Sequence, residues 1–447
     1  MIDPDLATQT IRQALERGAT DAECTLAEGE EFSAVVRMRS LEKLKDAGSR
    51  AAGLRVLVGR RVGSAYTSDL SAAGIRMLVD SAIEIAAIST EDPHAGLPDA
   101  SELGALTADL ELYSTDIQNL DTAYRIEQAR ATEEATFAAD PRITNSEGSS
   151  FDAYSGARVF ANSRGFLGSY RLSSCSLHST PVAREGQFME RDYWYSSARS
   201  YAKLESPAAI GRRAAERTVR RLGARKVPTQ KVPVVFDPQT ARSLLGNIFD
   251  AVEGNSIYRS ASFLAGKLGE RIASENVTVI DDGTIPGLFG TSPFDDEGVP
   301  SRRTVVIDRG ILKSYLLNTY TAVKLGLKTT GNAARGITGN TGVGHGNLYL
   351  EKGDRSPDEI IRGIQKGLYV TELIGSSVNI VTGDYSRGAA GLWIENGEFA
   401  YPVSEITIAS TLQRMLTDVE SAGSDLDFRG SVASPTVVIR EMTVSGH

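Results

Sequence analysis

The chain has 447 residues, of which 41% are hydrophobic and 23% are charged, a balance typical of globular proteins and unlike that of disordered or fibrous ones. Its length favours two domains, each with a core of its own. The formal net charge of −9 provides no attraction to phosphate backbones, so the composition disfavours nucleic-acid binding.

The composition of the first residues gives no expectation of export. Residues 1–5 are acidic where a signal peptide would have a basic region followed by an apolar stretch. The most apolar helical stretch, residues 75–88, contains Asp80 and Glu84, so no segment approaches the apolar length that spans a bilayer. We therefore expect a cytoplasmic protein without a membrane segment.

The first half of the chain shows the same order of elements twice. Residues 5–17 predict an amphipathic helix, residues 30–66 several strands, and residues 71–88 a second helix. After residue 117 a helix at 120–138, strand-like segments at 150–203 and another helix follow. Ser206 and Pro207 open that last helix, as an N-cap residue and a proline at the first helical position. We infer a weak duplication of one helix–sheet–helix unit.

The last of these helices carries the one dense basic run of the sequence. Its members are Arg212, Arg213, Arg217, Arg220, Arg221, Arg225 and Lys226. The run has no neighbouring aromatic residues to stack on bases, so we interpret it as a water-facing helix end whose charges suit the helix dipole. It leads into a connector with two prolines, residues 226–233, where we place the domain boundary.

Beyond the connector the pattern changes to short strands and tight turns. Residues 305–312 and 393–399 predict hairpins, the second with an Asn-Gly turn, and residues 436–444 predict a closing strand. Helices are expected at 238–252 and 358–367. The predicted fold is α+β: an N-terminal duplicated helix–sheet–helix domain, residues 1–227, precedes a mostly antiparallel, β-rich and barrel-like C-terminal domain, residues 228–447.

The sequence lacks the residues of a histidine-based catalytic zinc site. Its four histidines are His94, His178, His345 and His447, and its two cysteines are Cys24 and Cys175. No two histidines lie within one helical turn or inside a short ligand loop, whereas a catalytic zinc needs converging side chains. We expect the cysteines to be small buried thiols rather than metal ligands or a disulfide.

Three other motifs have simpler structural interpretations. The glycine-rich residues 339–346 lead into a strand-like segment, whereas a phosphate loop opens a helix, so we expect a flexible surface loop or lid with a solvated His345. The acidic clusters at 281–283 and 295–298 offer oxygen ligands for a hard cation, but Asp-Gly is also common turn chemistry. Residues 383–388 do not form a serine nucleophile elbow.

Residues 382–408, which read Thr-Gly-Asp-Tyr-Ser-Arg-Gly-Ala-Ala-Gly-Leu-Trp at their start, closely resemble the signature of the TldD/PmbA family in the form of its PmbA (TldE) branch. The segments 281–284, 296–298 and 330–332 occur in the order of further family landmarks. The resemblance covers essentially the whole chain.

The resemblance implies that this chain has lost the zinc-binding residues of the family's peptidase branch. In the TldD branch a helix reading His-Glu-x-x-x-His, with a later Cys, binds the zinc of a metallopeptidase. The similar segment here, residues 243–254, has Gly246 and Asn247 in place of the first His and the Glu, and Ala251 or a neighbour in place of the second His. No Cys follows Cys175. The resemblance thus implies a non-catalytic subunit without a metal or other cofactor of its own.

Such a subunit is expected to pair with a TldD-type subunit that binds zinc and cleaves small or unfolded peptides. Tyr385, Arg387 and Trp393 are candidate contacts for the peptide or the partner, with core packing as the alternative for Trp393. A homodimer in the absence of the partner stays open. The alternatives are a stand-alone hydrolase with an unrecognised site and a regulatory binding protein of the gyrase-modulator type.

Overall fold

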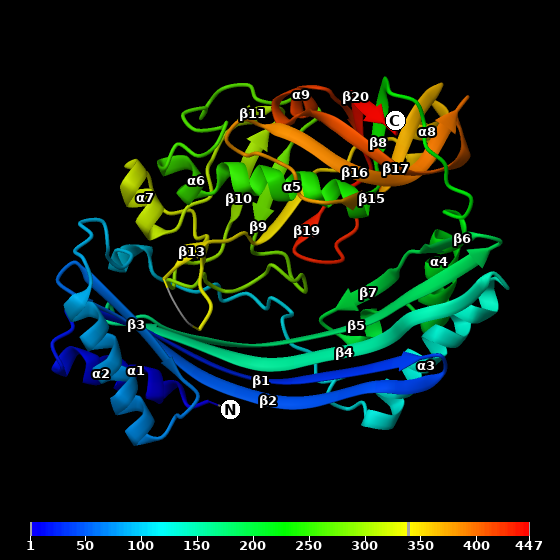
Figure 1. Ribbon diagram of the computed structural model, residues 1–447. Coiled ribbons are helices and arrows are strands. Elements are labelled where there is room, and N and C mark those ends of the chain that lie inside the picture. Colours follow the sequence, from blue (N-terminus) through cyan, green and yellow to red (C-terminus); the bar gives the residue numbers. More distant parts are fainter. Residues whose placement is uncertain (1, 338–339, 447) are drawn as a thin grey trace.

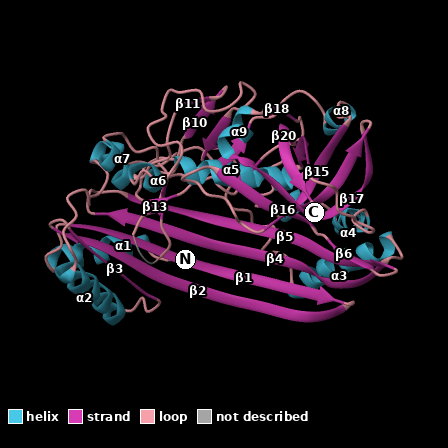
Figure 2. Ribbon diagram, turned by 45° about the horizontal axis from the view of Figure 1, so that its top comes forward, coloured by secondary structure: helices cyan, strands magenta, loops and turns pink. Residues whose placement is uncertain are grey.

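A long curved sheet lies beneath a strand-rich second part in the computed structural model, which describes residues 2–337 and 340–446 (Figure 1). Figure 2 shows the longest strands of this sheet running side by side. The mixture of helices with mostly antiparallel strands confirms the predicted fold class. The predicted division at residue 227 stays a prediction, although β8, the first strand of the second part, begins close to it at Gln230.

The large sheet is antiparallel throughout and has the strand order β3-β2-β1-β4-β5-β6, with β7 paired to β5. Its strands are β1 Asp21–Arg37, β2 Ser40–Val58, β3 Arg61–Thr67, β4 Ile143–Asn162, β5 Leu167–Glu185, β6 Phe188–Arg191 and β7 Trp194–Ala198. The four longest strands have 17 to 20 residues. At about 3.3 Å per residue they extend over roughly 55–65 Å, long enough to form a trough under the whole second part.

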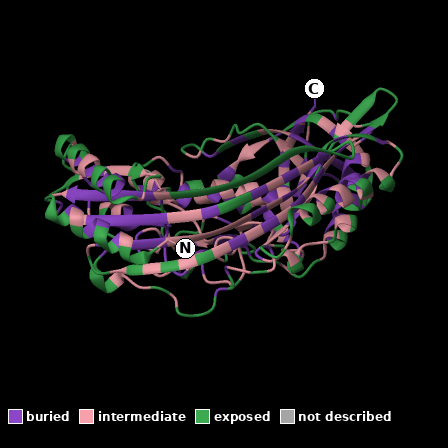
Figure 3. Cartoon of the chain, turned by 90° about the horizontal axis from the view of Figure 1, so that it is seen from below, coloured by how far each residue is buried: buried purple, intermediate pink, exposed green. Residues whose placement is uncertain are grey.

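Two helix pairs cover the same face of this sheet at its two ends. The helices are α1 Pro4–Glu16, α2 Ala72–Ile88, α3 Thr122–Ala139 and α4 Pro207–Val219. On β1, Leu26 packs in a core with α1 and α2, whereas Phe32 and Ala34 pack with α3 and α4. Even-numbered residues of one strand point to one face, so both pairs lie on the face turned away from the second part (Figure 3).

The order of helix, strands and helix therefore recurs as predicted, and both units contribute to a single sheet through the β1–β4 pairing. At the tip of the β1–β2 hairpin, Met38 and Arg39 both have positive φ angles, of 50° and 66°. The buried Glu133 of α3 accepts hydrogen bonds from their backbone N–H groups at 3.0 and 2.6 Å. A helix of the second unit thus stabilises a turn of the first.

The second part contains two larger sheets. A six-stranded sheet has the order β17-β16-β15-β8-β20-β18, and a β17–β20 pairing closes it into a barrel. A five-stranded sheet has the order β11-β10-β9-β14-β19. The strands are β8 Gln230–Phe236, β9 Val279–Asp282, β10 Arg303–Asp308, β11 Ile311–Leu312, β12 Ala333–Ala334, β13 Gly342–Val343, β14 Asn347–Leu350, β15 Lys366–Ile374, β16 Asp384–Glu395, β17 Glu398–Thr411, β18 Val419–Ala422, β19 Val432–Ala433 and β20 Val437–Ser445.

The helices of the second part are α5 Pro238–Val252, α6 Gly254–Tyr258, α7 Thr319–Leu325, α8 Pro357–Arg362 and α9 Leu412–Thr417. Both predicted hairpins are confirmed, and Asn396 and Gly397 have the positive φ angles of a type I′ turn. The helix predicted at 358–367 is too long. It ends at Arg362 because Lys366 already begins β15, whose pairing with β8 and β16 overrides the local preference.

Both cysteines are free and buried, as expected, and burial raises the pKa of the Cys24 thiol to about 12. None of the helices within the described ranges has both the length and the apolar composition needed to cross a bilayer.

A buried ion-pair cluster joins the large sheet to the second part. Glu23 of β1 is fully buried and pairs with Arg55 of β2 at 2.7 Å and with Arg335, just after β12, at 3.0 Å. Arg335 also donates a hydrogen bond to the Thr25 hydroxyl. Because one carboxylate serves two buried guanidinium groups, its loss would leave two positive charges without compensation.

We predict that Glu23→Gln lowers the free energy of unfolding by about 3 kcal/mol, the low end of the range for breaking a buried pair. The low end applies because burial raises the pKa of Glu297, repulsion by the Glu23 charge raises it further, and the substitution relieves that repulsion. Denaturant unfolding measures the change. The control is Glu31→Gln on the same strand, whose partner Lys45 is 56% exposed, and which should cost under about 1 kcal/mol. Equal effects of the two variants would contradict the prediction.

Candidate functional site

Helix α5 lies at the face of the second part that is turned toward the large sheet (Figure 1). It begins with Asp237 as N-cap, whose carboxylate accepts from the Thr240 N–H, and with Pro238 at the first helical position. Leu245, Ile248 and Val252 bury one side of the helix in the barrel core. The opposite side, with Ser243, Gly246 and Asp250 one turn apart, is more open.

The three positions at which the resemblance implies a lost zinc motif have different surroundings on this helix. A side chain at Gly246 would meet no atom within 4 Å, so this position faces open space. Asn247 lies on another side, where its amide nitrogen is buried and finds no hydrogen-bond acceptor among the described residues. Ala251 is fully buried. The structure therefore does not bring these three positions together on one open surface.

Charged residues fix the beginning of α5 against α4. Arg217 of α4 is 6% exposed and contacts the carboxylates of Asp192 at 3.3 Å and Asp237 at 3.4 Å. Burial raises the pKa of Asp237, while the Arg217 charge acts in the opposite direction. Because Asp237 is also the N-cap, this ion pair couples the position of α5 to the N-terminal part of the chain.

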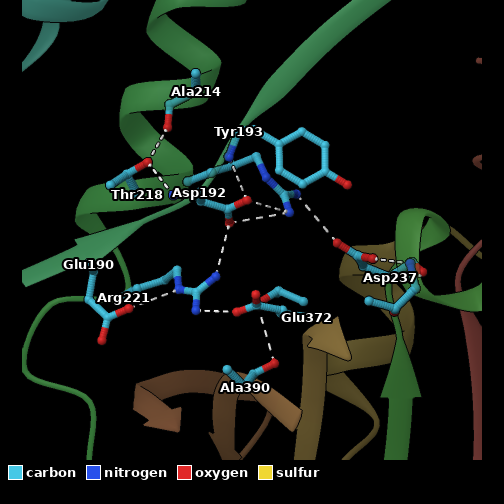
Figure 4. Close-up of polar contacts among 12 residues, drawn as sticks. Glu190, Asp192, Tyr193, Ala214, Thr218, Arg221, Asp237, Glu372 and Ala390 are labelled. Atoms are coloured by element: carbon cyan, nitrogen blue, oxygen red, sulfur yellow. Dashed lines mark hydrogen bonds and ion pairs between the residues drawn. The ribbon is translucent and has the colours of Figure 1, made fainter. Parts of the chain in front are cut away.

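The neighbouring Arg221 extends the network to the barrel (Figure 4). Its guanidinium contacts Glu190 at 3.3 Å and also pairs with Glu372 of β15. The interpretation of the basic run as water-facing is wrong for Arg217 and Arg221, since both make ion pairs between elements that are distant in sequence. Arg212 and Arg213 of the same run are exposed, as predicted.

A cavity of about 500 Å³, here called the helix cavity, adjoins this network. Its lining includes Gln239, Thr240, Arg242 and Ser243 of α5, Thr371 to Leu373 of β15, and Thr180, Arg191 and Asp192 of the large-sheet region. Arg387 of β16 also lines it, and its Nε is buried without an acceptor among the described residues. This candidate contact therefore faces an accessible polar cavity.

The other two candidate contacts lie elsewhere. Tyr385 and Trp393 are each 1% exposed and belong to the core of the barrel. Trp393 stacks on Tyr401, with 6.5 Å between ring centroids. Core packing is the alternative for Trp393, and Tyr385 is equally buried, so neither side chain is placed as a surface contact, whereas Arg387 lines the helix cavity.

A second cavity of about 270 Å³, here called the loop cavity, lies between the large sheet and the loops around β9 and β14. The segments singled out in the sequence gather here: its lining includes Asp281, Gly283, Asp295, Asp296, Gly331, Asn332, Gly344 and His345. Arg158 of β4 forms an ion pair with Asp296 across the boundary at 2.9 Å. The landmark residues thus surround one cavity although they are far apart in the chain.

Asp281 is the most unusual acid of the loop cavity. It is 2% exposed, and one of its oxygens accepts from the Asn332 amide at 2.7 Å. The other oxygen is buried and has no partner at full hydrogen-bond geometry among the described residues, although the backbone N–H of Gly346 lies near this carboxylate and lowers its pKa. Burial raises the pKa of Asp281 to about 6, against the opposing effects of the Asn332 hydrogen bond and the His345 charge.

Asp295 and Asp282 behave as the turn interpretation predicts. Asp295 accepts from the backbone N–H groups of Glu297 and Val299, and Asp282 accepts from Thr284. The carboxylate of Glu297 accepts from the Thr319 N–H at 2.9 Å. These groups organise the loops and are already occupied, so they contribute walls to the loop cavity rather than free ligands.

The three described histidines have separate environments. His178 on β5 stacks on Tyr193, His94 lies near Asp92 in the loop after α2, and His345 packs edge-on against Phe249 of α5. His345 is half-buried rather than solvated, because this contact holds it at the loop cavity. His447 and residue 339, the first residue of the glycine-rich loop, lie outside the described residues. Within the described ranges no three His, Cys, Asp or Glu side chains gather in a metal-binding group.

Sequence analysis missed Arg199, which lines the loop cavity just after β7. It is 7% exposed and donates to the carbonyl oxygens of Ser173, Leu288 and Phe289 at 3.0 to 3.3 Å. It belongs to no motif and to no charge run, so the sequence contained no signal that distinguishes it from a surface arginine.

The chain is similar to known proteins over its full length. Three family models match, described as PmbA/TldA metallopeptidase domain 1 at residues 22–86, central domain at 115–222 and C-terminal domain at 229–446. Metalloprotease PmbA of Escherichia coli O157:H7 is 38% identical over 441 residues, which cover 98% of this chain and 96% of that protein.

Two solved structures extend the comparison. A Bacteroides thetaiotaomicron protein proposed to be a modulator of DNA gyrase is 30% identical, with a TM-score of 0.92 and coverage of 99% of this chain and 98% of the other. TldE from Thermococcus kodakarensis has a TM-score of 0.88 at 21% identity, covering 99% of this chain and all of the other, and this likeness concerns the fold alone.

The raised pKa of Asp281 predicts a pH dependence of stability. Since the folded-state pKa of about 6 lies above the ordinary aspartate pKa of 3.8, the folded chain retains the proton more tightly than the unfolded chain does. The wild type should therefore lose up to about 3 kcal/mol as the pH rises from about 4 to about 8, and Asp281→Asn should not show this loss.

Denaturant unfolding of both proteins across this pH range measures the difference. The control is Asp354→Asn, which removes one exposed carboxylate and changes the net charge equally. A pH profile of Asp281→Asn that runs parallel to that of the wild type would contradict the prediction.

Proposed function

The chain belongs to the PmbA/TldD metallopeptidase family, and we propose that it is a PmbA/TldE-type, non-catalytic subunit of a metallopeptidase complex. In this proposal a TldD-type subunit carries the zinc and cleaves small or unfolded peptides. The chain described here completes and encloses the chamber in which cleavage occurs.

The chemistry of α5 carries the proposal. Glycine at 246 and alanine at 251 offer no side-chain donor atoms, and Ala251 is fully buried. A catalytic zinc needs three protein ligands that converge on one open position. The residues at the expected motif positions do not fit that requirement, so no step of peptide hydrolysis is assigned to this chain.

The helix cavity supports a role in enclosing a peptide. Pairing between β15 and β8 ends at Val370, while Thr371 to Leu373 continue along the cavity. Backbone groups of a strand that lacks a neighbour on one side are available to an extended peptide. Arg387 and Arg242 at the same cavity provide guanidinium donors suited to a peptide carboxylate.

Two alternative functions remain outcomes of the same test. A stand-alone hydrolase draws its support from the acidic groups of the loop cavity, Asp281 above all. A regulatory binding protein draws its support from the description of the B. thetaiotaomicron relative as a proposed modulator of DNA gyrase.

We predict that co-expression with a TldD-type subunit from the same genome yields a stable heteromeric complex that cleaves peptides. Light scattering measures the assembly, elemental analysis the zinc content, and a fluorogenic unfolded peptide the activity, for each chain alone and for the pair. Zinc should accompany the TldD-type subunit. Stoichiometric zinc and peptide cleavage by the present chain alone would support the stand-alone hydrolase and sink this proposal. Binding to gyrase without any effect on peptide turnover would support the regulatory alternative.

We predict that Arg387→Ala in this chain lowers peptide turnover by the pair through a higher KM or weaker assembly, since Arg387 faces the helix cavity. The matched control is Arg440→Ala, which removes an exposed guanidinium from β20. Steady-state kinetics and light scattering separate the two effects. If both variants match the wild type in assembly and KM, Arg387 contacts neither the peptide nor the partner.

A further inference from the structure

Two oppositely charged groups at the loop cavity lack full compensation. Arg199 is 7% exposed, yet every acceptor that it reaches among the described residues is a neutral carbonyl oxygen. Its Nε is buried and donates to no described acceptor. Burial lowers the pKa of Arg199, and the Tyr170 phenol is the one described ionisable group whose charge opposes this.

A buried guanidinium is normally paired with a carboxylate, because the desolvation of an unpaired charge is costly. The remaining buried arginines at this boundary follow that rule: Arg335 pairs with Glu23 and Arg217 with Asp192 and Asp237. Arg199 has no carboxylate partner among the described residues; the half-buried Arg220 at the end of α4 shares this feature, but Arg199 in addition lines a cavity. This combination indicates that an anionic group belongs beside it.

Asp281 is a buried carboxylate on the same cavity, with a charge opposite to that of Arg199. Its exposed fraction is 2%, and its second oxygen has no side-chain partner among the described residues, with the neutral backbone N–H of Gly346 as the nearby donor. A buried carboxylate with a free oxygen is suited to accept hydrogen bonds from an ammonium group. His345 lies close enough to act on the charge of Asp281, but it does not occupy that oxygen.

Closely packed backbone segments and the Asn347 side chain connect the surroundings of the two charged groups along the cavity wall. Arg199 donates to the Phe289 carbonyl, and the next residue, Gly290, packs so tightly on Gly346 that a side chain there would collide with it. Gly346 in turn packs on Gly283, two residues after Asp281. These glycines allow the segments to approach closely, so a small ligand can reach both charged groups.

We propose that the loop cavity binds a small zwitterion, a free amino acid or a dipeptide, with its carboxylate on Arg199 and its ammonium group on Asp281. The cavity of about 270 Å³ lies just below the range of about 300–1,000 Å³ typical of drug-sized ligands, which suits a ligand of this size. Phe289, Phe294 and Leu172 provide apolar walls for its side chains. The site is independent of the proposed peptidase complex, because all of its groups belong to this chain.

The test uses the unmodified full chain and three probes, measured by isothermal titration calorimetry. Ala-Ala carries both charges, N-acetyl-Ala-Ala lacks the ammonium group, and Ala-Ala amide lacks the carboxylate. We expect Ala-Ala to bind with 1:1 stoichiometry and each blocked probe to bind at least about tenfold more weakly. No binding of Ala-Ala up to its solubility, or equal affinity for all three probes, would overturn the proposal.

Variants then assign each end of the ligand. Arg199→Lys should weaken Ala-Ala but leave the affinity for Ala-Ala amide unchanged, and Asp281→Asn should weaken Ala-Ala but leave that for N-acetyl-Ala-Ala unchanged. The control is Arg303→Lys, an exposed arginine that does not line this cavity, which should leave the affinity for all three probes unchanged. Thermal unfolding verifies that each variant folds. If Arg199→Lys does not fold, the series of blocked probes on the unmodified chain still decides the outcome.

Discussion

Buried and half-buried guanidinium–carboxylate pairs between the N-terminal part of the chain and the second part are the constraint on which the rest of the structure depends. Glu23 with Arg335, Arg158 with Asp296 and Arg217 with Asp237 join segments that are far apart in the sequence. Each pair is stable only when both partners meet in the right geometry, because an unpaired buried charge is costly. The pairs therefore contribute less to net stability than to the one orientation in which sheet and barrel fit together.

The same pairs account for the two cavities. Charged side chains line the space between the large sheet and the second part. Apolar side chains therefore do not fill this space completely. The helix cavity lies beside the Arg221 and Arg217 pairs, and the Arg158–Asp296 pair lines the loop cavity. Where the large sheet meets the second part, the other fully buried arginines have carboxylate partners. Arg199 has none, which is consistent with an anionic ligand beside it.

Local signals in the sequence predicted local structure well. Asp237-Pro238 and Ser206-Pro207 began helices as expected, and Asn396-Gly397 formed its turn, since caps and turns depend on neighbouring residues. The meeting of Arg335 with Glu23, 312 residues apart, could not be predicted, because it depends on the register of strands from two parts of the chain. The resemblance identified the α5 segment, but only the structure showed that Ala251 faces the core while Gly246 faces open space.

These environments explain why α5 is held so firmly although it offers no metal ligands. Its first turns form a wall of the helix cavity, and near its end Phe249 packs against His345 of the loop cavity, with 5.0 Å between ring centroids. If α5 shifted along its axis, Asp237 would leave Arg217, Phe249 would leave His345, and both cavities would change shape. A helix without catalytic groups therefore still needs an exact position, and the ion pair at its N-cap provides it.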